Sequence, residues 1–225
     1  LELYFTDDLL LKNFIAKGLV KNMTLKVNKV LNLEETKFNF FFDSSDVLIK
    51  NIFSKTNGIL VKNGNVRIVK NKEINLKSDF ISNIKVDKKN ISNFLPYLKN
   101  FDLINDKTIL DARLENFLDI TFDETLKIID YTYKNKGAVN NFFVNFDNPI
   151  SNSFLDNSIK ILKIKDSNIE FNSKLGKKNS INASGIYSID SKNYQKYTIE
   201  NENLNKISST TLNFEFSQKL NIDFI

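Results

Sequence analysis

The feature that most constrains this chain is the alternation of apolar and polar residues over residues 110–122. Successive side chains of a β-strand point to opposite faces, so the pattern predicts one strand with one apolar face. At about 3.3 Å per residue the strand spans roughly 43 Å, whereas a typical strand has only about five or six residues. A strand of this length favours an elongated sheet. The residues of its apolar parity, broken only by Asn116, are Leu110, Ala112, Leu114, Leu118, Ile120 and Phe122.

The same alternation recurs along most of the chain, and short polar stretches separate the segments. Asn63-Gly64 follows Ile59 and Val61, and this dipeptide predicts a type I′ hairpin turn. Residues 176–179, with the sequence GKKN, predict a second turn. The fold class predicted from these signals is mainly β, a long antiparallel meander that forms an elongated, curved, open groove.

The apolar parities of these segments define the residues expected to line the groove. The C-terminal stretch alternates in the same way and ends on an apolar residue, so we expect an unpaired, self-associating edge over 211–224. The predicted lining residues are Phe38, Phe40, Phe42, Leu110, Leu114, Leu118, Ile120, Phe122, Ile169, Phe171, Leu175, Ile181, Leu212, Phe214, Phe216, Leu220, Ile222 and Phe224.

One segment departs from the two-residue period. Over residues 88–103, Ile91, Phe94, Leu95 and Leu98 recur close to helical spacing, which predicts one short helical segment near 90–101. This segment would divide the meander at 88–106. We treat residues 1–225 as a single β-groove section, and the ragged ends suggest a fragment of a longer chain.

The chain has no cysteine and no histidine. Their absence excludes thiol nucleophiles, histidine bases, disulfides and the usual zinc sites, so we expect no cofactor, no metal and no enzymatic activity. The acidic row that contains Asp111, Glu115 and Asp119 is not a paired acid and base, because residues i and i+4 on one strand lie about 13 Å apart. We interpret this row as a solvated outer face.

The net charge of +5 comes from lysines that are spread along the whole chain. The sequence has 34 asparagines and two arginines, and this bias indicates a low-GC genome. Nucleic-acid readers use arginine for bidentate contacts, so we expect no nucleic-acid partner. The longest apolar runs are only a few residues, which excludes a transmembrane helix in this stretch.

Residues 14–68 and 164–195 resemble the repeating unit of the AsmA/TamB/YhdP group of bacterial envelope proteins. In the first stretch, FIAKGLVKNMTLKVNKVLNLEETKFNFFFDSSDVLIKNIFSKTNGILVKNGNVRI, the similar features are two amphipathic strands, the step from Gly58 to Val61, and Asn63-Gly64. The second stretch, IKDSNIEFNSKLGKKNSINASGIYSIDSKNYQ, is similar to repeats nearer that group's C-terminal half.

The resemblance implies a very long antiparallel sheet in the periplasm, part of the cell envelope. It implies an inner-membrane anchor that lies outside this chain, and neighbouring repeats of the same protein as partners. The implied function is passive transport of phospholipids between the inner and outer membranes, with acyl chains held on the groove. The alternatives are a structural or adhesive envelope domain with a closed dry core, and a transmembrane β-barrel, which shares the two-residue period.

Overall fold

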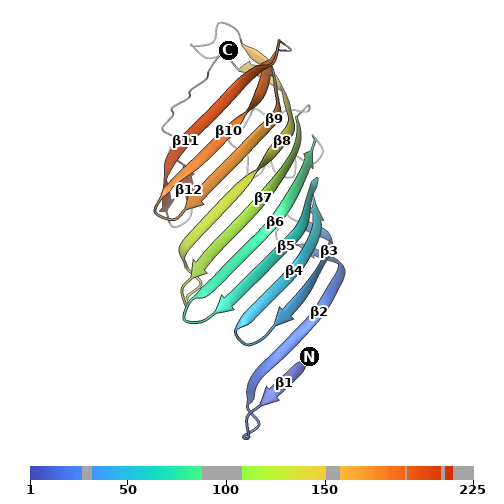
Figure 1. Ribbon diagram of the computed structural model, residues 1–225, viewed down its shortest axis with the longest axis vertical. Coiled ribbons are helices and arrows are strands. Elements are labelled where there is room, and N and C mark those ends of the chain that lie inside the picture. The colour runs from blue at the N-terminus through green and yellow to red at the C-terminus, as the bar shows by residue number, and fades with distance from the viewer. Residues whose placement is uncertain (27–31, 88–107, 151–157, 191, 209–210, 215–225) are drawn as a thin grey trace.

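The fold is a single antiparallel sheet in a computed structural model that describes residues 1–26, 32–87, 108–150, 158–190, 192–208 and 211–214. Each strand pairs only with its neighbours in the sequence, in the order β1 to β12 (Figure 1). The strands are β1 (Glu2–Phe5), β2 (Leu11–Lys26), β3 (Asn32–Phe42), β4 (Asp46–Thr56), β5 (Ile59–Lys70), β6 (Ile74–Val86), β7 (Ile109–Phe122), β8 (Ile128–Ile150), β9 (Ile159–Lys174), β10 (Lys178–Ile189), β11 (Gln195–Ser208) and β12 (Thr211–Phe214).

The predicted mainly β antiparallel meander is therefore confirmed, and the sheet is open. Strands β1 and β2 lie at one end of the long axis, and β9 to β11 lie towards the other (Figure 1). The expected curvature is wrong, because the sheet is uncurled. The physical reason is the connectivity: pairing between sequence neighbours extends the sheet in one direction, and no pairing among the described strands draws its edges together.

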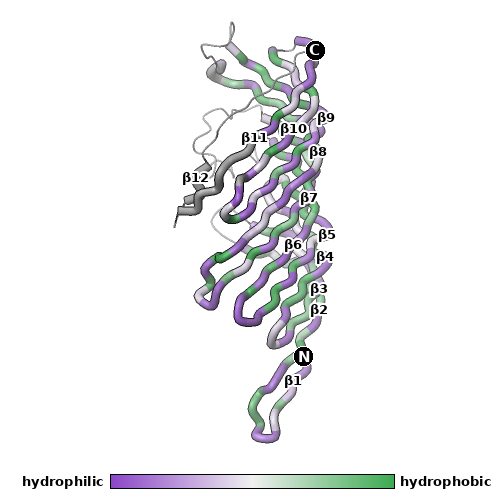
Figure 2. The backbone as a smooth tube through the Cα atoms, turned by 60° about the vertical axis from the view of Figure 1, so that its left-hand side comes forward, coloured by the Kyte–Doolittle hydropathy of each residue, from purple (hydrophilic) through white to green (hydrophobic). Residues whose placement is uncertain are grey.

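The register between β6 and β7 defines the two faces of the sheet. Leu76 lies opposite Ile120, and Val86 lies opposite Leu110, without interruption between them. Directly opposed residues of antiparallel strands point to the same face. We call the face that carries Leu114 the apolar face and the face that carries Glu115 the polar face. The alternation of hydrophobic and hydrophilic residues is visible along the strands in Figure 2.

The long strand predicted over 110–122 is confirmed as β7. Strand β8 is longer still, with 23 residues. The helical segment near 90–101 and the division at 88–106 lie outside the described residues. Strands β6 and β7, which flank that segment, pair directly with each other.

The turn predicted at Asn63-Gly64 is wrong. These residues lie inside β5, where Asn63 has φ 51° and the register with β6 shifts between Lys62 and Asn65. The chain instead turns at the other Asn-Gly pair, Asn57-Gly58, where both residues have positive φ as a type I′ turn requires. Asparagine tolerates the left-handed region better than other non-glycine residues, so the same dipeptide serves a bulge in one place and a turn in the other.

The best-buried apolar side chains lie on the apolar face, where β6 to β10 adjoin. Val86, Ala112, Val139 and Ala183 are each no more than 9% exposed. Their register partners run across consecutive strands, as when Ala112 lies opposite Val139. The core is therefore a band across one face of the sheet.

Candidate functional site

The apolar face brings most of the predicted lining residues together. Phe40 pairs with Ile49, whose row continues through β5 and β6 to Leu118, so the N-terminal phenylalanines share a face with β7. The rings of Phe40 and Phe42 stack with centroids 4.8 Å apart. The residues that the register places on this face are Phe38, Phe40, Phe42, Leu110, Leu114, Leu118, Ile120, Phe122, Ile169, Phe171 and Ile181.

The remaining predicted residues lie at or beyond the ends of the described strands. Leu175 follows β9, and its N–H donates to the carbonyl of Tyr131 at 3.1 Å, which continues the same row. Leu212 and Phe214 lie in β12. Phe216, Leu220, Ile222 and Phe224 fall outside the described residues.

The predicted lining side chains of β3 and β7 are half-buried, neither enclosed nor fully exposed. In the described parts of the chain no second layer of strands or helices packs on them. The apolar face there consists of a band of partly accessible side chains.

A line of small polar residues crosses this face, and the sequence pattern indicates only one of them, Asn116. We call it the polar belt. Each member is buried although it lies among phenylalanine, leucine and isoleucine, because these larger neighbours enclose it. The polar belt comprises Thr36, Ser54, Ser82, Asn116, Asn135, Ser173 and Asn179, each 2–8% exposed.

Hydrogen bonds join the polar-belt members of β6, β7 and β8, whereas the buried Asn179 amide has no hydrogen-bond partner among the described residues. The Asn116 amide donates to Ser82 Oγ at 2.7 Å, and its oxygen accepts from Asn135 at 2.6 Å and from the Tyr133 hydroxyl at 3.0 Å. Thr36 and Ser54 form a separate pair at 2.8 Å. Buried polar groups satisfied in this way cost little.

Tyr133 carries the one titratable group whose pKa changes at the belt. Burial raises the pKa of the Tyr133 phenol, and a hydrogen bond with Asn135 lowers it to a smaller extent. The phenol is therefore neutral throughout the physiological range and acts as a hydrogen-bond donor to Asn116.

The polar face holds cross-strand ion pairs, as expected for a solvated face. Lys77 lies 3.2 Å from Asp119, and Lys136 lies 3.7 Å from Glu115. Asp111 lies 3.9 Å from Lys85. Each member of the acidic row is thus beside a lysine of a neighbouring strand, and no two of its carboxylates are arranged as an acid and a base.

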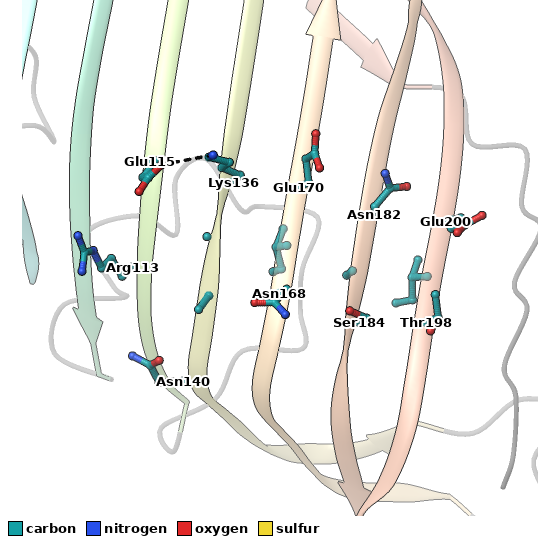
Figure 3. A pocket seen from close by; sticks show the side chains of 15 residues that line it. Arg113, Glu115, Lys136, Asn140, Asn168, Glu170, Asn182, Ser184, Thr198 and Glu200 are labelled. Atoms are coloured by element: carbon teal, nitrogen blue, oxygen red, sulfur yellow. Dashed lines mark ion pairs between the residues drawn. The ribbon is translucent and has the colours of Figure 1, made fainter.

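Three hollows lie over the polar face, with volumes of about 710, 580 and 1060 Å³. Figure 3 shows the first, where labelled side chains project from β7 to β11. Of the predicted lining residues, only Ile169 lines any of these hollows. The hollows were not predicted, because period-two alternation shows which face of a strand is polar but not where that face is recessed.

Within the described residues, no group of three histidine, cysteine, aspartate or glutamate side chains could hold a metal ion. None of the described segments is a helix long and apolar enough to cross a membrane. No family model matches the chain, and neither a curated protein nor a solved structure matches it.

Proposed function

We propose that this chain is a section of a lipid-conducting groove in the cell envelope, which carries phospholipids passively between the inner and outer membranes. The observation that supports this most directly is the half-buried apolar face of an open sheet. A closed dry core would need a second layer of comparable area on that face. The resemblance of residues 14–68 and 164–195 to the AsmA/TamB/YhdP repeats supports the same proposal.

The proposed mechanism uses burial of hydrocarbon and no catalysis. Acyl chains lie against side chains such as Leu114, Ile120 and Phe171, and each buried CH₂ contributes about 0.8 kcal/mol. Headgroups stay in water at the margin of the sheet. Because many apolar residues repeat along the face, a chain can slide between equivalent positions.

The polar belt is compatible with sliding. Asn116 uses its amide nitrogen and oxygen within the belt, so an acyl chain that crosses it does not have to break a hydrogen bond to water. The phenylalanines that flank the belt, Phe80 and Phe171 among them, provide apolar surface on either side.

The proposed partners and location follow from this function. Phospholipid acyl chains are the ligands, neighbouring repeats of the same protein extend the sheet, and an anchor outside this chain holds it to the inner membrane. The location is the periplasm. The chain then has no enzymatic role and needs no cofactor.

Photocrosslinking of envelope lipids tests the proposal. A photoreactive residue replaces Leu114 on the apolar face or, as the matched control, Glu115 on the polar face; the two positions are neighbours in β7 and belong to opposite faces. We expect lipid adducts at position 114 and few at 115. Equal labelling at both positions, or none at 114, would favour a structural or adhesive domain instead.

A further inference from the structure

Two of the hairpin turns share one unusual geometry. In the turn between β1 and β2 the Thr6 N–H donates to the Leu10 carbonyl at 2.8 Å, and the Leu9 N–H donates to the Thr6 carbonyl at 3.0 Å. The turn between β7 and β8 repeats this pattern over residues 123–127, with distances of 2.9 and 3.0 Å. The fourth residue of each turn has a left-handed backbone, Leu9 with φ 62° and Leu126 with φ 64°.

Leucine is a costly residue in this conformation. A left-handed backbone brings Cβ close to a carbonyl oxygen, so glycine, asparagine and aspartate adopt it far more readily than other residues. Elsewhere in the described residues the positive-φ positions are held by these three residue types, apart from Glu35. Asparagine is abundant in the sequence, so genome composition does not account for the two leucines.

The packing of the chain does not offset this cost. Leu9 is 81% exposed and Leu126 is 67% exposed, and further large apolar side chains beside them are exposed as well. Each turn therefore carries a small apolar cluster in solvent. We call the two clusters the leucine tips; they comprise Phe5, Leu9, Leu10 and Leu11 in the first and Leu126, Ile128 and Ile129 in the second.

Both leucine tips lie at the same margin of the sheet. Neighbouring strands from β1 to β8 are all antiparallel, so the turns after β1, β3, β5 and β7 lie at one margin (Figure 1). Six strand steps separate β1 from β7, and at roughly 4.8 Å per step the tips lie roughly 29 Å apart. The two turns between them, residues 43–45 and 71–73, contain only polar residues.

The size and spacing of the tips favour a membrane surface over a protein partner. A stable protein interface buries about 800 Å² on each partner, mostly within one patch. Two clusters of a few side chains at this separation do not form such a patch. A bilayer surface, in contrast, accepts apolar side chains wherever they meet it, and the polar turns between the tips would remain among the headgroups.

The charges at the tips indicate which kind of membrane surface they suit. Asp7 and Asp8 precede Leu9, and Asp123 and Glu124 precede Leu126. An anionic bilayer has a negative surface potential, which would repel these carboxylates at the point of contact. A zwitterionic surface carries no such penalty.

We propose that the two leucine tips insert together into the surface of a zwitterionic membrane, so that this margin of the sheet rests on the bilayer. Burial of the tip side chains in the membrane then offsets the conformational cost of leucine in the turns. The contact does not rest on the proposed lipid transport, which uses the apolar face. Lipid labelling at position 114 and membrane binding at the tips can therefore fail independently.

Flotation of the 225-residue chain with phosphatidylcholine vesicles tests the proposal. These vesicles have no net charge, so the lysines of the chain give no general electrostatic attraction. We expect half of the chain to float at about 1 mM accessible lipid. Leu9→Asn and Leu126→Asn should each weaken binding about fivefold, and the double variant about twentyfold, because the apolar contact is lost.

The same substitutions should stabilise the fold. Asparagine adopts the left-handed backbone more readily than leucine, so each variant should melt about 2–4 °C higher by circular dichroism. A leucine that served only the fold would give the opposite result, a lower melting temperature. Weaker membrane binding together with a higher melting temperature is therefore the signature of the proposed contact.

Leu19→Asn provides the matched control. Leu19 is 52% exposed, but it lies in the interior of β2, away from the turns. Its replacement should leave vesicle binding unchanged. Absence of flotation with phosphatidylcholine, unchanged binding in the double variant, or binding only to vesicles that contain phosphatidylglycerol and only at low salt would overturn the proposal.

Discussion

Each of the strands β2 to β5 contains an interior residue whose backbone φ is positive, in the left-handed region. Strands β6 and β7, in contrast, pair without a register shift along the whole of β6, from Ile74 to Val86. The register of β2 to β5 shifts around these residues. They are Asn22 (φ 55°), Glu35 (φ 47°), Asn51 (φ 58°) and Asn63 (φ 51°).

Strands with bulges and strands without them therefore maintain the same separation of apolar and polar side chains onto opposite faces of the sheet. A bulge adds one residue, which would reverse the parity of every later side chain if the register did not shift with it. In β5 the apolar face continues from Val61 to Gly64 across the bulge. Three of the four bulge residues are asparagine, so part of the asparagine content that we attributed to genome composition has a conformational role.

The largest expected effect is at Gly137 of β8, within the stretch from Ala112 to Thr121 where the β7–β8 register is unbroken. A Cβ there would collide with the carbonyl oxygen of Arg113, which is backbone held in the β7–β8 ladder. Gly137→Ala should therefore destabilise the fold by about 3 kcal/mol or more. Urea denaturation followed by circular dichroism measures this loss.

Gly18→Ala in the bulged region is the matched substitution. A Cβ there would lie 2.7 Å from the end of the Phe40 ring, which can rotate away. We expect a loss below about 1.5 kcal/mol. Similar losses at both glycines would contradict the distinction between a rigid ladder and an adjustable one.

The second effect is at the polar belt, which is a network in the regular region and a single pair in the bulged one. Asn116→Leu leaves Asn135, Ser82 and Tyr133 without their partner and should cost about 2–3 kcal/mol. Thr36→Val removes one hydrogen bond with Ser54 and should cost about 1 kcal/mol. Denaturation midpoints measure both; an equal cost would show that the network adds nothing beyond its separate bonds.

The third effect tests the bulges directly. Asn63→Val places a β-branched residue at φ 51° and should cost about 1–2 kcal/mol, whereas Asn63→Gly should be almost neutral. Asn83→Val in the regular β6 should be neutral or stabilising, because valine favours extended backbone. If valine is tolerated equally at both positions by thermal denaturation, the left-handed conformation is not what asparagine provides at 63.

The smallest expected effect is on the pH dependence of stability, and it should be similar for the turn after β3 and the turn after β7. Asp43 follows β3 and Asp123 follows β7, and each accepts hydrogen bonds from its own turn. At Asp123 the Thr125 hydroxyl is the main cause of a lowered pKa, and at Asp43 it is the Ser45 N–H.

A carboxyl whose pKa is lowered by folding stabilises the fold above its unfolded pKa, near 4, and loses this contribution as the pH falls through the folded value. Asp123→Asn and Asp43→Asn should therefore each flatten the fall in stability between about pH 5 and pH 2. Urea titrations at several pH values measure how steeply the free energy of unfolding falls with pH. If this slope is the same in both variants as in the unchanged protein, the two turns are not its source.

The sequence predicted the faces of the sheet well where the backbone is regular. From Leu110 to Phe122 each side chain lies on the face that parity assigns, since nothing interrupts the period. It failed at Asn63-Gly64, because a turn and a bulge require the same left-handed backbone and the dipeptide does not distinguish them.

The candidate sites were harder to predict than the fold. Each residue of the polar belt interrupts an apolar row within its own strand, and only the alignment of Ser82, Asn116 and Asn135 across β6, β7 and β8 makes a network of them. The hollows over the polar face depend on which polar side chains come together, such as Asn168 with Ser184, and that depends on the register between strands. Alternation within one strand carries no information about register.

The connectivity of the sheet has a mechanical consequence. Since each described strand pairs only with strands adjacent to it in the sequence, the sheet is quasi-one-dimensional, like a repeat protein. Tension applied to its two ends would load the hydrogen bonds of one ladder after another and peel the strands off singly. When the tension is released, each detached strand could pair again with the neighbouring strand that remains in the sheet. Stretching would therefore be reversible in steps of one strand.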